Sequence, residues 1–413
     1  MSSPPPAPAP AVRARRRAQA AIFVTALLDL LGFGMILPIL PFYAQEYGAT
    51  DFQVGVLFAS YSAAQLVFAP LLGRLSDRLG RRPVLLASIA GAFLAHLAFA
   101  GAGSFAVLLA ARTAAGMAAG NLSIAQAYMA DVTPPGERSR AMGLIGAAFG
   151  LGFILGPAFG GALALIDRVA VPLGAAALAA INLAVASLWL PESRDLAARR
   201  RSREGRWLDP RAIGRLAADR PIVGLLVLSF LVTFCVSLME ATLALFVQAR
   251  FGFGDWETSM LFVLVGVVMV VVQAGLVGRA VARWGERRLI PFGMVAMGVG
   301  LLVLGAAGAV AALAVALGLL ALGAGLNNPT TLGLLSQLSG EEAQGGVLGL
   351  ARSAGALARV VGPLAGTWIF ARAGEPWPFW SGGGLMIASL VLAAWVVREA
   401  GRRLAGGANA PAP

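Results

Sequence analysis

Two acidic residues lie inside long apolar runs, where a carboxyl group could bind and release a proton. Asp29 is ten residues into a run that begins near residue 19, which is ~15 Å along a helix. Glu240 lies beyond the centre of another run. A carboxylate in apolar surroundings is costly, so each must face a cavity or a partner. Alternatively, Asp29 makes only a structural hydrogen bond, and Glu240 pairs with an arginine or with water.

Three arginines, Arg112, Arg352 and Arg359, occupy similar apolar runs. A guanidinium keeps its proton in practice, so each of them needs an acceptor. Arg352 and Arg359 are seven residues apart and share one face of a helix, where both could contact an anionic or zwitterionic group. The alternatives are a salt bridge for Arg352, a packing role for Arg359, and hydrogen bonds to backbone carbonyls for Arg112.

Four weaker polar candidates also interrupt apolar runs: His96, Asn121, Gln126 and Asn327. His96 could relay protons, although a lone histidine in a helix is more often neutral and hydrogen-bonded. Asn121, Gln126 and Asn327 could contact a bound molecule. Hydrogen bonds between helices explain them equally well.

The rare residue types exclude several kinds of chemistry. All 32 basic residues are arginines, so the chain lacks the lysine that a Walker A loop or a Schiff base needs. Cys235 is the one cysteine and His96 the one histidine, which rules out an internal disulfide and argues against a Cys/His metal cluster or a histidine-based triad. The apolar runs contain no cluster of acids. We therefore expect no metal, no cofactor and no enzymatic activity.

The elements that must position these residues are membrane-spanning helices. Of the 413 residues, 58% are apolar and 13% charged, and the mean hydropathy is +0.79; soluble proteins have ~45–50% and ~25%. A spanning helix needs ~20 apolar residues. The sequence predicts an all-α integral membrane protein with twelve transmembrane helices in two pseudo-symmetric six-helix bundles. The predicted helices are 19–43, 52–74, 83–103, 105–130, 139–165, 170–190, 221–248, 257–279, 289–309, 311–337, 344–371 and 377–398.

The arginines also predict the topology. With the N-terminus inside, the cytoplasmic segments hold 26 of the 32 arginines, the outer loops three and the spans three. The positive-inside rule then places both termini in the cytoplasm. This accounts for the net charge of +12 without a nucleic-acid partner. The predicted segments are a disordered tail (1–18), a six-helix bundle (19–190), a cytoplasmic linker loop (191–220), a second six-helix bundle (221–398) and a tail (399–413).

The two halves of the sequence resemble each other. Three features of the first half recur in the second half, at offsets of 205, 206 and 206 residues. Gly73–Gly80 corresponds to Gly278–Gly285, Gly156-Pro157 to Gly362-Pro363, and Asn121 to Asn327. Near-constant offsets indicate duplication of a six-helix unit. Parallel repeats of this kind hold a ligand near the midplane and rock one half against the other.

Four motifs of the first half carry a resemblance to a known family: Leu28–Pro41, Gly73–Pro83, Arg112–Gly116 with Gly120, and Gly152–Gly161. In this order and on these helices they resemble the major facilitator superfamily of transporters, and within it the drug/proton antiporter branch that includes tetracycline efflux proteins. The resemblance implies secondary active transport by alternating access. It further implies proton-coupled efflux of a small organic or drug-like molecule.

The resemblance suggests roles for particular residues. Asp29 and Arg112 join Glu240 as candidates for proton coupling, with Arg112 biasing a nearby acid. The loop between the second and third helices becomes a gate, in which two glycines allow a tight turn and Asp77 pairs with an arginine or a helix terminus across the two halves. The gate residues are Gly73, Asp77, Arg78, Gly80 and Arg81. The second copy has Ala282 in place of Asp77, and a merely topogenic arginine cluster is the alternative.

The fifth predicted helix is rich in small residues and contains one proline, which suits a bent, closely packed hinge. Ordinary helix packing would give the same pattern. The hinge candidates are Gly152, Gly156, Pro157, Gly160 and Gly161.

Other functions fit the same scaffold. One is a proton-coupled carrier of a single metabolite, working by uptake or export. Another, of a different class, is a non-transporting receptor or sensor, which would need a soluble domain larger than the loop 191–220. The expected partners are a small-molecule substrate, protons and the lipid bilayer, with a monomer as the expected state. The alanine-rich, lysine-free composition points to a bacterial plasma membrane.

Overall fold

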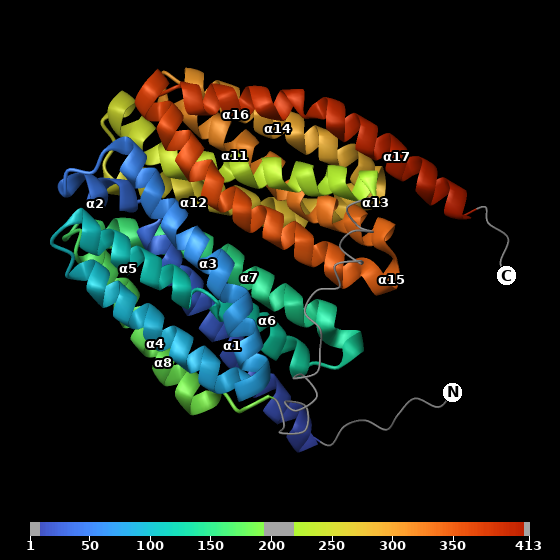
Figure 1. Cartoon of the computed structure of the whole chain (residues 1–413), viewed down its shortest axis with the longest axis horizontal. Coiled ribbons are helices and arrows are strands. Elements are labelled where there is room, and N and C mark those ends of the chain that lie inside the picture. Colours follow the sequence, from blue (N-terminus) through green and yellow to red (C-terminus); the bar gives the residue numbers. More distant parts are fainter. Residues whose placement is uncertain (1–8, 194–218, 409–413) are drawn as a thin grey trace. The chain divides into compact units, whose positions relative to one another are not determined.

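The computed structural model describes residues 9–193 and 219–408, which are almost entirely helical (Figure 1). Twelve of the described helices are long and apolar enough to cross a membrane. This confirms the predicted all-α fold with twelve transmembrane helices. Most of the predicted linker loop lies outside the described residues, as do residues 1–8 and 409–413 of the predicted tails. The spans are Arg15–Ile36, Asp51–Leu79, Arg81–Ala100, Phe105–Asp131, Arg140–Ala164, Ala170–Trp189, Arg220–Phe251, Asp255–Trp284, Glu286–Ala306, Val310–Ser339, Gln344–Ala373 and Trp377–Leu404.

Contacts divide the chain into two compact units, of which the first comprises residues 1–37 and 67–205. Within it, α1 packs along α7 and α8, and α4 packs along α5 and α8. In Figure 1, α1, α4 and α8 accordingly lie side by side. Its elements are α1 (Ala9–Ile36), the second part of α3 (Asp51–Leu79), α4 (Arg81–Ala100), α5 (Phe105–Ala118), α6 (Asn121–Asp131), the 3₁₀ turn η1 (Pro135–Glu137), α7 (Arg138–Ala164) and α8 (Ala170–Trp189).

The second unit comprises residues 38–66 and 206–413. Here α15 packs along α11 and α14, and α16 packs on α14. Residues 38–66 thus belong with the second unit, although they precede most of the first in sequence. The elements are α2 (Leu40–Glu46), the first part of α3, α11 (Arg220–Phe251), α12 (Asp255–Val271), η2 (Val272–Leu276), α13 (Val277–Trp284), α14 (Glu286–Ala306), α15 (Val310–Ala373), α16 (Trp377–Ala388) and α17 (Leu390–Ala408).

Several spans have bounds or breaks that the hydropathy pattern did not predict. The helix that contains the first span, α1, begins at Ala9 and ends at Ile36, just before Pro38, whose missing N–H cannot continue the helical hydrogen bonding. The fourth is broken between Ala118 and Asn121. The eighth contains a π-helical segment, η2, and the twelfth is divided at Ser389 and continues to Ala408. The tenth and eleventh spans share one element, α15, because helical backbone continues through the expected loop at 338–343.

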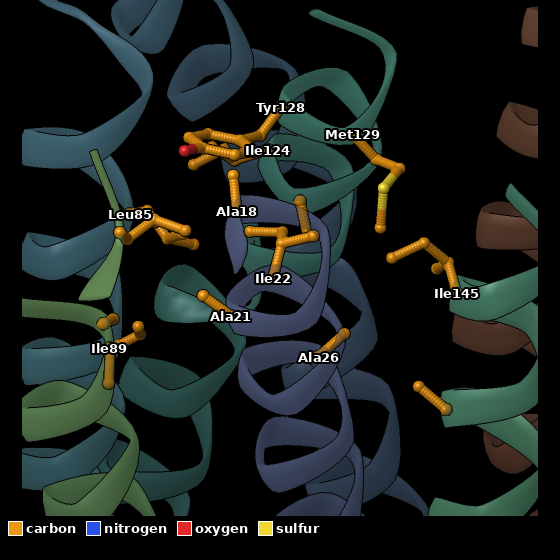
Figure 2. Packing of buried hydrophobic residues seen from close by; sticks show 14 of the residues in the cluster. Ala18, Ala21, Ile22, Ala26, Leu85, Ile89, Ile124, Tyr128, Met129 and Ile145 are labelled. Atoms are coloured by element: carbon orange, nitrogen blue, oxygen red, sulfur yellow. The ribbon is translucent and has the colours of Figure 1, made fainter. Parts of the chain in front are cut away.

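Small apolar side chains on α1 form the centre of the core of the first unit (Figure 2). The buried residues Ala18, Ala21, Ile22 and Ala26 recur at helical spacing, so they face one side of α1. Around them lie Leu85 and Ile89 from α4, Ile124, Tyr128 and Met129 from α6, and Ile145 from α7. This packing fixes α6 against α1, which positions the polar residues described below. A second cluster, centred on Leu225, Met294, Leu334, Val347 and Val396, forms part of the core of the other unit.

Glycines bring α7 into backbone contact with α1. A Cβ atom at Gly156 would lie 2.8 Å from the Cα of Gly34, and one at Gly160 would lie 2.4 Å from the carbonyl oxygen of Met35. The repeat carries the same arrangement into the second unit. There a Cβ at Gly362 would lie 2.7 Å from the carbonyl oxygen of Phe234 on α11. Each unit therefore contains at least one helix pair that tolerates no side chain at the crossing.

The turn between α3 and α4 depends on Gly80. Its φ of 111° and ψ of 153° belong to a region that is essentially restricted to glycine. Gly285, the corresponding residue of the repeat, also has a positive φ, of 71°. Gly73 lies inside α3 and does not contribute to the turn, which corrects the expectation that both glycines of this loop are needed for it.

The two glycines should therefore respond oppositely to substitution by alanine. Gly80→Ala is expected to destabilise the protein by ~1–3 kcal/mol, because the side chain strains the backbone. Gly73→Ala should leave stability unchanged or raise it by up to ~1 kcal/mol, since alanine favours a helix and a Cβ there meets no atom within 4 Å. Melting temperatures of the two purified variants test this. A Gly80→Ala variant as stable as Gly73→Ala would contradict it.

Candidate functional site

Asp29 is held by a hydrogen bond from α6. The side-chain amide of Asn121 donates to Asp29 Oδ1 at 2.8 Å. Asn121 is the first residue of α6 and is buried, directly after the break in the fourth span. At this break the chain packs closely on α3, since a Cβ at Gly120 would lie 2.6 Å from the Leu72 side chain. The partner expected for a carboxyl group at this depth is thus an amide from a neighbouring helix.

Arg112 and His96 lie near the same stretch of α1. Arg112 is buried on α5, and its guanidinium carbon is 5.7 Å from the ring centre of Phe33. Phe33 is one turn beyond Asp29, on the same face of α1. His96 Nε2 lies 3.8 Å from the position a Cβ would take at Gly32, and Arg112 acts on His96 electrostatically. The first unit therefore gathers an acid, an arginine and a histidine along one segment of α1.

The second unit gathers a different set of groups. Glu240 on α11 and Arg359 on α15 act on each other electrostatically, and so do Arg359 and Tyr61 of α3. Thr233 precedes Glu240 by seven residues and shares its face of α11. A Cβ at Gly355 would lie 3.7 Å from Thr233 Oγ1 and 3.9 Å from Arg359 Nη1, so Thr233 and Arg359 both lie beside Gly355.

The turn after α3 is tied into the first unit by Arg81. Its buried guanidinium contacts Asp77 at 2.8 Å, Asp131 at 3.1 Å and the hydroxyl of Ser76 at 2.7 Å. Glu192 accepts hydrogen bonds from the backbone N–H groups of Arg81 and Arg82 at the N-terminus of α4, at 2.9 and 3.3 Å. A carboxylate at this place satisfies otherwise unpaired helical donors.

Of the remaining predicted site residues, Asn327 differs most clearly from its counterpart in the first unit. Asn327 is buried, but its amide donates to the carbonyl of Gly323 in its own helix and packs against Gly293. It therefore does not repeat the contact that Asn121 makes. Gln126 is partly buried on α6, and Arg352 is exposed on α15. Among the described residues, no three His, Cys, Asp or Glu side chains are placed to hold a metal ion.

Sequence reasoning missed several residues that the structure adds to these groups. Tyr61 and Thr233 were not singled out, although each is a polar side chain in an apolar run. Glu192 follows the sixth span directly and was not connected with Arg81, from which it is separated by more than a hundred residues. Hydroxyl groups are common in membrane helices, so only the packing distinguishes these from the others.

Comparison with known proteins identifies the family of this chain. A sequence model of the Major Facilitator Superfamily matches residues 22–279 and 274–412. The tetracycline resistance protein of class C from Escherichia coli is 33% identical over 87% of this chain and 91% of its own length. Human major facilitator superfamily domain-containing protein 10 is 31% identical over 90% of this chain and 91% of its own.

Solved structures show the same fold. The crystal structure of the human organic anion transporter MFSD10 (TETRAN) has a TM-score of 0.69 at 31% identity and covers 92% of this chain and 99% of that one. A bacterial homolog of the human lysosomal transporter Spinster, inward-facing and occupied, has a TM-score of 0.72 at 14% identity, with 94% and 97% covered.

Twelve apolar helices, an internal repeat and charged groups inside the spans define a multi-pass membrane transporter and not an enzyme. The chain belongs to the Major Facilitator Superfamily and resembles the tetracycline efflux proteins over most of its length. The resemblance expected from the four sequence motifs is thus confirmed.

Proposed function

We propose that the protein exports a small organic molecule in exchange for protons, by alternating access. The observation that carries this proposal is the Asn121–Asp29 hydrogen bond, which holds a carboxyl group within a membrane span. A carboxyl group held in this way can bind a proton and release it when its surroundings change. Arg112, close to the same segment of α1, supplies a fixed positive charge that biases this exchange.

The other predicted roles belong to the same proposal. The Arg81 cluster acts as the gate, and the glycine contact of α7 with α1 acts as the hinge. Both termini face the cytoplasm of a bacterium, as the arginine distribution indicates, and the transporter works as a monomer in the plasma membrane. Glu240 is a second proton-binding candidate.

The names of the relatives suggest two kinds of cargo. Tetracycline resistance proteins from Escherichia coli favour a drug-like molecule. The organic anion transporter MFSD10 favours a second candidate function, the carriage of one organic anion, and Arg359 supports it because a mid-span arginine suits an anionic cargo. The direction of substrate flux distinguishes export from uptake.

The test uses purified protein in proteoliposomes that contain a pH-sensitive dye. With an acidic lumen, tetracyclines, fluoroquinolones and hydrophobic cations are added in turn. We expect at least one compound to evoke proton release in the wild type, and Asp29→Asn to abolish that release, because an amide cannot carry the proton. Asp167→Asn, which alters a carboxylate in the loop between α7 and α8, is the matched control and should behave as wild type.

Proton release that survives Asp29→Asn would remove Asp29 from the proton path and leave Glu240 as the candidate. No response to any compound would contradict broad drug export and favour a carrier of one metabolite. Equal melting temperatures of the two variants would show that a lost signal reflects coupling and not unfolding.

A further inference from the structure

Arg359 is a cation held far from both ends of its span. It lies 15 residues after Gln344 and 14 before Ala373, which places it ~21 Å from either end. Its side chain is exposed. In the part of the chain that the structure describes, no hydrogen bond or ion pair holds its guanidinium. An arginine at this depth requires an acceptor, which either water or a bound anionic group can supply.

Glu240 is near enough to act on Arg359 but does not pair with it directly. The two charges therefore remain separate, and the guanidinium keeps its five N–H donors available. A closed ion pair would have used these donors internally. In this open arrangement, the guanidinium can still donate hydrogen bonds to a ligand.

The neighbouring helices bring polar groups towards Arg359, and α11 also carries aromatic rings. Tyr61 brings a phenol group from α3, and Thr233 brings a hydroxyl from α11. On α11, Phe230 lies three residues before Thr233 and Phe234 directly after it. Their rings stack with their centres 6.1 Å apart, and both residues are partly exposed. The geometry suits a ligand that carries an anionic group on an apolar, preferably aromatic, body.

We propose that Arg359 binds the anionic group of the transported molecule, an apolar organic carboxylate, with Tyr61 beside it and Glu240 as the counter-charge of the empty site. A guanidinium and a carboxylate can form two parallel hydrogen bonds, which explains why an arginine is used here. This inference rests on the proposed function in that it names the chemical class of the cargo.

The arrangement gives the two charged residues opposite effects. Removing Arg359 removes the attraction, so carboxylate binding should weaken. Removing the charge of Glu240 removes a repulsion between two anions, so carboxylate binding should tighten. A merely structural pair would weaken binding in both cases, so the opposite signs distinguish recognition from scaffolding.

The experiment measures binding to purified protein in lipid nanodiscs by calorimetry. The probes are 2-naphthoate, salicylate and indole-3-acetate, each with its neutral amide. Arg359→Gln should weaken binding of at least one carboxylate by on the order of 10- to 100-fold and leave binding of its amide unchanged. Arg359→Lys should be intermediate, and Glu240→Gln should tighten binding by about 3- to 10-fold.

Arg372→Gln is the matched control, because Arg372 lies in the last turn of the same helix and should not affect binding. The proposal is overturned if no carboxylate binds better than its amide, or if Arg359→Gln and the wild type bind the carboxylates equally. Binding that depends on Arg359 without any proton release in proteoliposomes would support this inference while contradicting the proton coupling proposed above.

Discussion

Replacing Gly156 by leucine should prevent most of the protein from accumulating in a folded form. A Cβ at this position would lie 2.8 Å from the Cα and 2.9 Å from the carbonyl carbon of Gly34. These are backbone atoms, so no rotamer change can relieve the overlap and α1 must move away from α7. Overpacking costs ~1–3 kcal/mol where side chains can adjust. Here we expect the upper end of that range or more, against a total stability of ~5–15 kcal/mol.

The measurement is the monodisperse yield and the melting temperature of the purified variant. Gly143→Leu is the control on the same helix, because a Cβ at Gly143 meets no atom within 4 Å. Gly362→Leu should repeat the loss in the second unit, where a Cβ would lie 2.7 Å from the backbone of Phe234. Equal yields and melting temperatures for Gly156→Leu and Gly143→Leu would disprove the close approach of α1 and α7.

Substitution of Arg81 by glutamine should destabilise the protein. The change leaves Asp77 and Asp131 without the buried guanidinium that contacts both. Breaking a fully buried ion pair costs ~3–5 kcal/mol. The two carboxylates are 36% and 24% exposed, so water screens part of the loss and we expect ~1–3 kcal/mol.

Thermal unfolding of the purified variants measures this effect. Arg78→Gln, at an exposed position of the same loop, should change the melting temperature little. Adding Asp131→Asn to Arg81→Gln should recover part of the loss, since one uncompensated charge is removed. No recovery in the double variant would show that Arg81 acts through packing alone.

The number and nature of the helices could be predicted because a membrane span needs a fixed length of apolar residues. The chain satisfies this requirement twelve times, and the glycine and asparagine repeats predicted a duplicated unit. The prediction that Gly156 packs at a helix crossing followed from its neighbours at spacing four, and the structure places it against Gly34. These features depend on local sequence, which can be read directly.

The helix breaks and the contacts between residues far apart in sequence could not be predicted in the same way. The hydropathy pattern predicted one continuous helix through Ala119 and Gly120. In the structure the helix is broken there, and Asn121 begins α6. The pairing of Arg81 with Asp131 joins residues 50 apart in sequence, and the proximity of Tyr61 to Arg359 joins helices far apart in the chain. Both depend on tertiary packing. A single sequence offers many polar residues as partners and no means to choose among them.

The assignment of residues 38–66 to the second unit has a consequence for biosynthesis. This segment contacts helices made much later, since α2 packs on α11, and a Cβ at Gly55 would overlap Thr367 of α15. The ribosome therefore completes the first six spans before the binding partners of α2 and early α3 exist. If the chain were divided at residue 205, the first fragment would contain the whole first unit, whereas the second would lack residues 38–66 of its own unit. Co-expression of both fragments is therefore the condition under which the second unit can finish folding.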